Sequence, residues 1–142
     1  MIAALAAAAV LATPACAPSV LHYRTTFVDA GAGTFVVHLQ VGAKTAPCTV
    51  SGYPRLEILG SKGRKLRTRV VHGGLALLQA PVRRIVVTRG RPAHLLVAYN
   101  DVPVGSETTC PSGTALLVNG VRVNVATTAC SRGRLLESPY IR

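Results

Sequence analysis

The sequence predicts an all-β protein with a single folded domain, and three observations lead there. Segments rich in valine, isoleucine and threonine alternate apolar and polar residues with period two. No long segment carries the apolar stripe of an amphipathic helix. Hydrophobic residues make up 49% of the 142 positions and charged residues only 15%, which is too apolar for a disordered chain.

Four β-hairpins are predicted in chain order, each joined by a turn that contains glycine. Their strand pairs are residues 20–28 with 34–41, 55–59 with 64–71, 84–88 with 93–99, and 115–118 with 121–125. The last has the strongest turn signal, because Asn119-Gly120 suits both central positions of a type I′ turn. A final strand is expected near Arg134–Glu137, and residues 75–79 fit either one helical turn or a strand.

The four cysteines are even in number and contain no Cys-x-x-Cys pair, which in an exported chain indicates two disulfides. A two-residue loop at Asn119-Gly120 places Cys110 opposite a residue next to Cys130. Pairing Val28 with Thr34 brings Cys16 within two residues of the position opposite Cys48. Of the three possible connectivities, the register therefore favours Cys16–Cys48 and Cys110–Cys130.

The N-terminal segment indicates export. An apolar run over residues 2–11 is too short to span a bilayer, and the small residues Thr13 and Ala15 precede Cys16 as in a cleavage site. We predict a signal peptide over residues 1–15 and a mature domain over 16–142. No lysine or arginine precedes the run, so an apolar arm is the alternative, and a lipidated Cys16 is an alternative to the disulfide.

The segment Cys48-Thr49-Val50-Ser51-Gly52-Tyr53-Pro54, together with the order of the cysteines and the stretch over residues 85–103, resembles the actinobacterial domain-of-unknown-function family 4232. This resemblance implies an exported or lipoprotein-anchored, immunoglobulin-like antiparallel β-sandwich, which here would have about eight or nine short strands. The turn residues 41–45 and Arg89-Gly90 depart from the family pattern. The resemblance supplies an architecture and a compartment but no activity.

The sequence carries no signature of an enzyme or of a bound cofactor. The Gly-x-Ser-x-Gly elbow of serine hydrolases is absent, and the five acidic residues are scattered along the chain. Tryptophan is absent and aromatic residues make up 4%, which disfavours a stacking platform for single-stranded nucleic acid or sugars. We therefore predict no catalytic residue, no cofactor and no metal site. Of the four histidines, His22 and His38 lie on the paired strands of the first hairpin, within reach of a shared ion, and the neighbouring Arg24 disfavours a cation there.

The remaining signal is a formal net charge of +11. Two basic clusters form the candidate anion-binding residues, namely Lys65, Arg67 and Arg69 on the second hairpin, and Arg83 and Arg84 in a cluster around the third. Anionic cell-wall polymers or acidic lipid headgroups would suit them, and export makes nucleic acid the least suitable partner. The main hypothesis is a non-enzymatic envelope module that binds or spaces something; the alternative is a secreted enzyme or metal carrier with a site assembled from distant histidine and acidic residues.

Overall fold

The computed structural model describes residues 12–142, so most of the predicted signal peptide lies outside the described residues. The strands of this part of the chain are, in order, β1 (Leu21–Gly31), β2 (Thr34–Ala43), β3 (Cys48–Val50), β4 (Leu56–Leu59), β5 (Arg69–His72), β6 (Ile85–Val87), β7 (Ala93–Asn100), β8 (Ser112–Gly113), β9 (Ala115–Val118), β10 (Val121–Val123), β11 (Thr127–Thr128) and β12 (Arg134–Glu137). Three single-turn 3-10 helices (Pro18–Val20, Ser61–Gly63 and Ala76–Leu78) and the short turn α1 (Cys130–Gly133) complete the fold. No helix in residues 12–142 has the length and apolar character needed to cross a bilayer.

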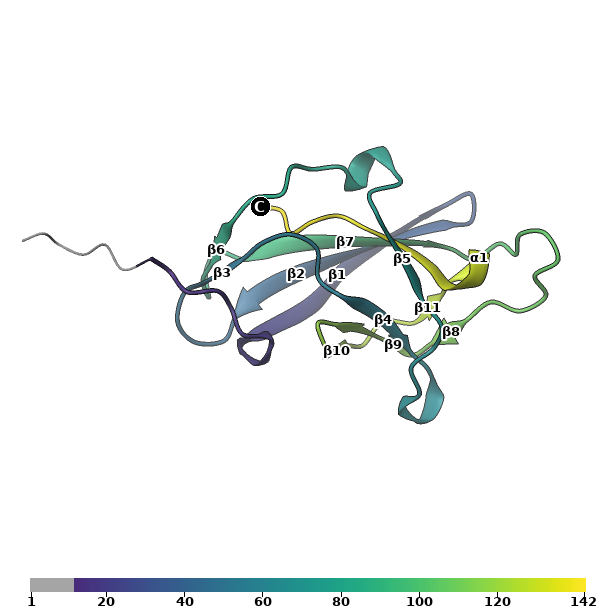
Figure 1. The fold of residues 1–142 in the computed structure, drawn as a ribbon, viewed down its shortest axis with the longest axis horizontal. Coiled ribbons are helices and arrows are strands. Elements are labelled where there is room, and N and C mark those ends of the chain that lie inside the picture. Colours follow the sequence, from purple (N-terminus) through teal and green to yellow (C-terminus); the bar gives the residue numbers. More distant parts are fainter. Residues whose placement is uncertain (1–11) are drawn as a thin grey trace, which may run out of the picture.

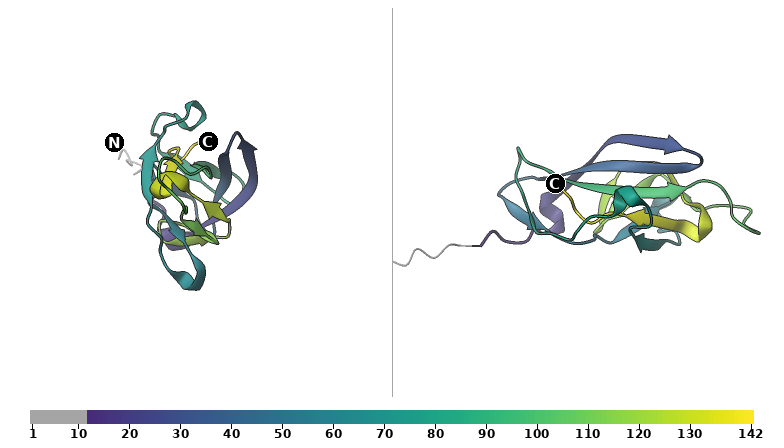
Figure 2. Two further views of the ribbon diagram at one scale, coloured as in Figure 1. Left: turned by 90° about the vertical axis from the view of Figure 1, so that its right-hand side faces the viewer. Right: turned by 90° about the horizontal axis from the view of Figure 1, so that it is seen from above.

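The strands form two packed layers, which confirms the predicted all-β sandwich (Figures 1 and 2). One layer is a five-stranded sheet in the order β1-β2-β7-β12-β5, and the largest sheet of the other is β10-β9-β4. Two-stranded ladders, β3-β6 and β8-β11, extend the structure at its two ends. Among the named strands of the described residues, all pairings are antiparallel except that of β5 with β12, and an isolated bridge between Ala15 and Thr49 is also parallel.

The main core lies between the layers. It is built from inward-pointing residues of both, among them Leu39 and Leu95 from the large sheet and Ile58 and Leu116 from the small one, all fully buried. A second, smaller cluster lies on the outer face of the large sheet, where Leu78 is buried. Because Leu78 belongs to the 3-10 turn Ala76–Leu78, the segment over residues 75–79 is a helical turn rather than a strand.

Two of the four predicted hairpins form as ladders. Val118 pairs with Val121 as expected, across Asn119 and Gly120 with φ of 48° and 78°. The first hairpin forms, but its predicted register is wrong. Gly31 pairs with Thr34, because the turn consists of Ala32 and Gly33 alone, with φ of 50° and 78°.

The other two predicted hairpins are wrong. After the turn over residues 60–63, the chain makes one bridge between Leu59 and Lys65 and then crosses to the other layer. β4 pairs with β9 and β5 with β12, so the two predicted partners lie in different sheets. Likewise β6 pairs with β3, whereas β7 lies between β2 and β12. Strand pairing depends on how the whole sandwich buries its apolar residues, and this tertiary context overrides the turn signals.

Both predicted disulfides are confirmed. Thr128 pairs with Ser112, and continuing this register places Cys130 directly opposite Cys110, one residue beyond the expected position. Cys16 donates its backbone N–H to Thr49, next to its partner Cys48. The sulfur of Cys16 is bonded to that of Cys48, and within residues 12–142 no cysteine is free.

Candidate anion-binding pocket

Four arginine side chains line one pocket of about 960 Å³ at the α1 end of the sandwich. Arg67 lies just before β5 and Arg69 in β5, whereas Arg132 lies in α1 and Arg134 in β12. Glu107 is the one acidic residue that lines the pocket, so the charge of the lining is strongly positive. Guanidinium groups bind phosphate and carboxylate groups through paired N–H donors, and the chemistry of the lining suits such anions.

The parallel ladder between β5 and β12 brings two of these arginines together. Arg134 pairs with Arg69 in register, and the alternation along both strands places their side chains on the outer face of the sheet. The Cα of Thr68 and the backbone carbonyl of Arg67 pack closely against Gly133, which fixes the approach of the two segments. Two like charges on neighbouring strands repel, and an anion between them would relieve that repulsion.

The turn α1 has a left-handed backbone. Ser131 and Arg132 have φ of 56° and 61° and Gly133 has φ of 75°. A left-handed conformation costs about 1 to 2 kcal/mol for each residue that has a Cβ, so the surroundings must hold this turn in place. Strain of this kind concentrates at binding sites, which fits the position of the turn in the pocket wall.

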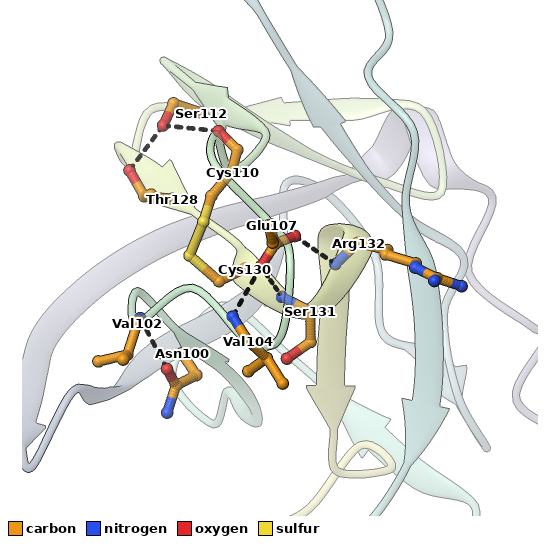
Figure 3. Close-up of a disulfide and its surroundings, with 10 residues drawn as sticks. All are labelled: Asn100, Val102, Val104, Glu107, Cys110, Ser112, Thr128, Cys130, Ser131 and Arg132. Carbon is orange, nitrogen blue, oxygen red and sulfur yellow. Dashed lines mark hydrogen bonds between the residues drawn. A yellow bond between two sulfur atoms is a disulfide. The ribbon is translucent and has the colours of Figure 1, made fainter.

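Glu107 is what holds the turn (Figure 3). Its carboxylate accepts the backbone N–H groups of Ser131 and Arg132, both at 2.9 Å, and that of Val104 at 3.3 Å. The hydrogen bonds from Arg132 and then Ser131 lower the pKa of Glu107, so this carboxylate stays ionised. Successive backbone N–H groups that converge on one carboxylate form an anion-binding concavity.

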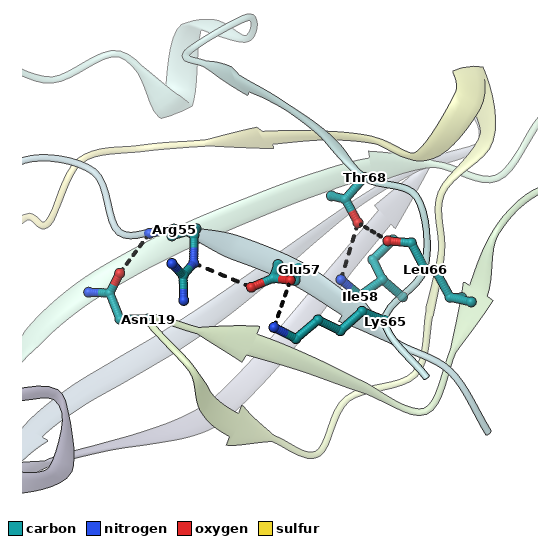
Figure 4. A network of polar contacts seen from close by, with 7 residues as sticks. All are labelled: Arg55, Glu57, Ile58, Lys65, Leu66, Thr68 and Asn119. Carbon is teal, nitrogen blue, oxygen red and sulfur yellow. Dashed lines mark hydrogen bonds and ion pairs between the residues drawn. The ribbon is translucent and has the colours of Figure 1, made fainter. Parts of the chain in front are cut away.

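The structure divides the five sequence-predicted basic residues among three places. Arg67 and Arg69 lie in the pocket. Lys65 instead pairs with Glu57 at 3.4 Å on the small sheet, where Arg55 also contacts Glu57 (Figure 4). Arg83 and Arg84 precede β6, at the opposite end of the sandwich from α1.

Sequence reasoning missed three residues of this pocket, Arg132, Arg134 and Glu107. The Ser-Arg-Gly-Arg segment directly after Cys130 was an available signal, because arginines next to a cysteine are held by its disulfide. The partnership with Arg67 and Arg69 had no local signal, since it depends on a parallel pairing between strands far apart in the sequence.

The histidines have separate surroundings. His22 covers Gly42, His38 lies 3.0 Å from Asp29, and His94 pairs through its backbone with Ile141. Among the residues described, the one group of three potential metal ligands is Glu107 with Cys110 and Cys130, whose sulfurs are joined to each other. These positions offer no histidine cluster for a metal.

A second unusual feature is a buried acid, Glu137 at the end of β12. Its side chain is 1% exposed, and neither carboxylate oxygen has a hydrogen-bond partner in the described chain. His72 Nε2 lies 3.2 Å from Glu137 Oε1, at ion-pair distance but outside hydrogen-bond geometry, and Tyr53 stacks on His72 with ring centroids 3.7 Å apart. Burial raises the pKa of Glu137 to about 8, so near neutral pH the folded protein keeps this group protonated.

This buried acid should make the fold less stable as pH rises. Unfolded Glu137 titrates near 4.3 and folded Glu137 near 8, so between these values the folded state holds the extra proton. The contribution of this extra proton to the free energy of unfolding is complete below about pH 4.3. It is lost as pH rises toward 8, at about 1.4 kcal/mol per pH unit. We expect Glu137→Gln to remove this slope in urea unfolding measured from pH 5 to 8.

Asp29→Asn is the matched control, because Asp29 also pairs with a histidine but is 67% exposed. Its slope should equal that of the unsubstituted protein. If the free energy of unfolding of Glu137→Gln and of the unsubstituted protein fell in parallel as pH rises, Glu137 would not change its protonation on folding.

Comparison with known proteins gives one match. The family described as "Domain of unknown function (DUF4232)" matches residues 16–134. No curated protein and no solved structure matches the chain.

Proposed function

The chain belongs to the DUF4232 family, whose description assigns no activity, and we propose that it is a non-enzymatic binding module of the cell envelope. Its ligand is an anionic cell-wall polymer, held through phosphate or carboxylate groups in the pocket of Arg67, Arg69, Arg132 and Arg134. The observation that carries this proposal is the convergence of four arginines with a single, internally bonded carboxylate.

The disulfides support an envelope location. Both pairs of cysteines are oxidised, and such bonds persist in oxidising compartments outside the cytoplasm. The apolar run over residues 2–11 and the small residues before Cys16 fit export through a signal peptide.

The placement of the pocket favours a wall polymer over a lipid surface. The β3-β6 ladder, to which the disulfide to Cys48 ties Cys16, lies at one end of the elongated sandwich, and α1, whose residues line the pocket, lies at the other (Figure 1). With its N-terminal side toward the membrane, the domain would therefore present the four arginines of the pocket away from the membrane. Polymers of the wall carry repeated phosphate or carboxylate groups, which match clustered guanidinium groups.

The test is co-sedimentation of the purified mature domain with isolated cell-wall sacculi across a salt series. We expect retention at low salt that falls steeply as salt increases, because screening weakens contacts between exposed charges. Arg69→Gln/Arg134→Gln should lower the affinity at low salt by about tenfold or more, since each charge-assisted hydrogen bond contributes about 1.5 to 3 kcal/mol.

Arg64→Gln/Arg91→Gln is the matched control, because it removes the same charge from exposed side chains outside the pocket. Equal losses in the two double variants would assign binding to overall charge and reject the pocket. Absence of retention at low salt would reject the wall polymer as ligand, and sacculi stripped of their anionic polymers should retain nothing.

A further inference from the structure

The pocket and the buried acid share one short structural element. The parallel ladder of β5 with β12 has four residue pairs, with Arg69 and Arg134 at one end and His72 and Glu137 at the other. β5 is an edge strand, because β12 is its one neighbour in the sheet. Whatever separates His72 from Glu137 therefore acts on the strand that carries Arg69.

The surroundings of Glu137 contain little that could stabilise a negative charge. Glu137 points to the same face as Leu135, into the core, and no lysine or arginine of the described chain forms an ion pair with it. The groups that face it are His72 from β5, which Tyr53 covers, and Tyr140 from the C-terminal segment. Tyr140 in turn shares a 2.7 Å hydrogen bond with Tyr23 of β1.

These tyrosines do not titrate in the range of interest. Burial raises the pKa of Tyr140 and of Tyr23 above their ordinary value of 10.0, so both hydroxyls stay neutral through pH 9. Within residues 12–142, His72 is therefore the side chain at ion-pair distance from Glu137, with Nε2 3.2 Å from Oε1. An uncompensated charge inside the core is costly, and the structure can relieve it by admitting water or by letting His72 and Glu137 move apart.

We propose that Glu137 and His72 form a protonation-controlled latch on the β5-β12 ladder, which positions the arginines of the pocket. With Glu137 protonated the ladder is closed, and Arg69 and Arg134 converge on one anionic group. With Glu137 ionised the ladder loosens from its His72 end, the arginines diverge and the anion is held more weakly. Glu137 and His72 are positioning residues in this scheme, and the regulation rests on the proposed anion-binding function.

The latch predicts a pH dependence that the binding groups themselves would not give. Arginines remain charged far above pH 9, and a phosphodiester carries a constant charge over this range. The pKa of Glu137, raised by burial to about 8, places the transition between pH 7 and 9. Neutral and mildly acidic conditions would thus favour binding and alkaline conditions would oppose it.

The experiment measures calorimetric binding of a glycerol phosphate oligomer to the mature domain at pH 6.5 and pH 9. We expect the unsubstituted protein to bind about fivefold more weakly at pH 9, and Glu137→Gln to bind equally at both. Asp29→Asn, which alters the exposed His38 pair, should behave as the unsubstituted protein. His72→Phe replaces the polar ring 3.2 Å from the Glu137 carboxylate with an apolar one, which disfavours the ionised carboxylate, so its loss of affinity should begin at higher pH.

Hydrogen exchange provides a readout that needs no ligand. Gly73 N–H donates to the backbone carbonyl of Glu137 at 2.8 Å and reports on the latch directly. Relative to Glu137→Gln at the same pH, the unsubstituted protein should lose protection at this amide and along β5 at pH 9 but not at pH 6.5. If the unsubstituted protein and Glu137→Gln exchange equally and their affinities change equally with pH, the latch is overturned. If neither pH gives binding but the unsubstituted protein still loses protection at pH 9 relative to Glu137→Gln, the anion-binding function alone is overturned.

Discussion

Replacing all four cysteines with serine is expected to leave the protein largely unfolded at 37 °C. The two disulfides close loops with sequence separations of 32 and 20 residues, and loops of this size contribute about 3 kcal/mol each by restricting the unfolded chain. A domain of this size has a net stability of about 5 to 15 kcal/mol, so a loss of about 6 kcal/mol removes between two fifths and all of it. Urea unfolding followed by circular dichroism measures the change.

The two pairwise variants separate the roles of the bonds. Cys110→Ser/Cys130→Ser should lose stability and also anion binding, because Cys130 begins the turn held by Glu107. Cys16→Ser/Cys48→Ser should lose comparable stability while keeping the pocket, because β3 and the turn α1 that lines the pocket lie at opposite ends of the sandwich (Figure 1). A fourfold variant with an unchanged urea midpoint would show that the core alone determines stability.

The disulfide pairing was predictable because it depends on local register. Asn119-Gly120 fixes the register of the last hairpin. That register places Cys110 within one residue of the position opposite Cys130. The first hairpin shows the limit of this reasoning. Ala32 adopts φ of 50°, which a residue with a Cβ rarely does, and so the sequence pointed to a longer turn than the two-residue one that forms.

The second and third hairpins failed for a different reason. Gly60 to Gly63 does reverse the chain, and the bridge from Leu59 to Lys65 begins a ladder. The ladder stops when Thr68 Oγ1 accepts the N–H of Ile58, so a side chain takes the place of the next backbone partner (Figure 4). Choice of partner strand is set by burial across the whole sandwich, which a turn motif does not encode.

Two of the four pocket arginines, Arg67 and Arg69, were predicted from the sequence, and Arg132 and Arg134 were not. A run of arginines near residue 67 marks a cationic strand, but consecutive left-handed residues at Ser131 and Arg132 have no sequence signature. The buried acid was equally hidden. Glu137 ends a short apolar strand and carries the pattern of an exposed terminal residue, whereas the structure encloses it beneath the C-terminal segment.

Gly133→Ala is expected to destabilise the protein by about 2 to 5 kcal/mol and to abolish anion binding. Gly133 has φ of 75°, which costs about 1 to 2 kcal/mol for alanine. A Cβ at this position would also collide with the backbone carbonyl of Arg67, which has no flexible side chain to move aside, and such overpacking adds about 1 to 3 kcal/mol. Urea unfolding and sacculus binding measure the two effects.

Gly120→Ala provides the matched comparison, because Gly120 has φ of 78° and no atom within 4 Å of an added Cβ. It should lose about 1 to 2 kcal/mol and keep full binding. The difference between the two variants isolates the contact of Gly133 with Arg67 from the cost of the left-handed backbone. Equal losses of stability would mean that the turn can shift away from β5, and the pocket would then not depend on the close approach of the segments that carry its arginines.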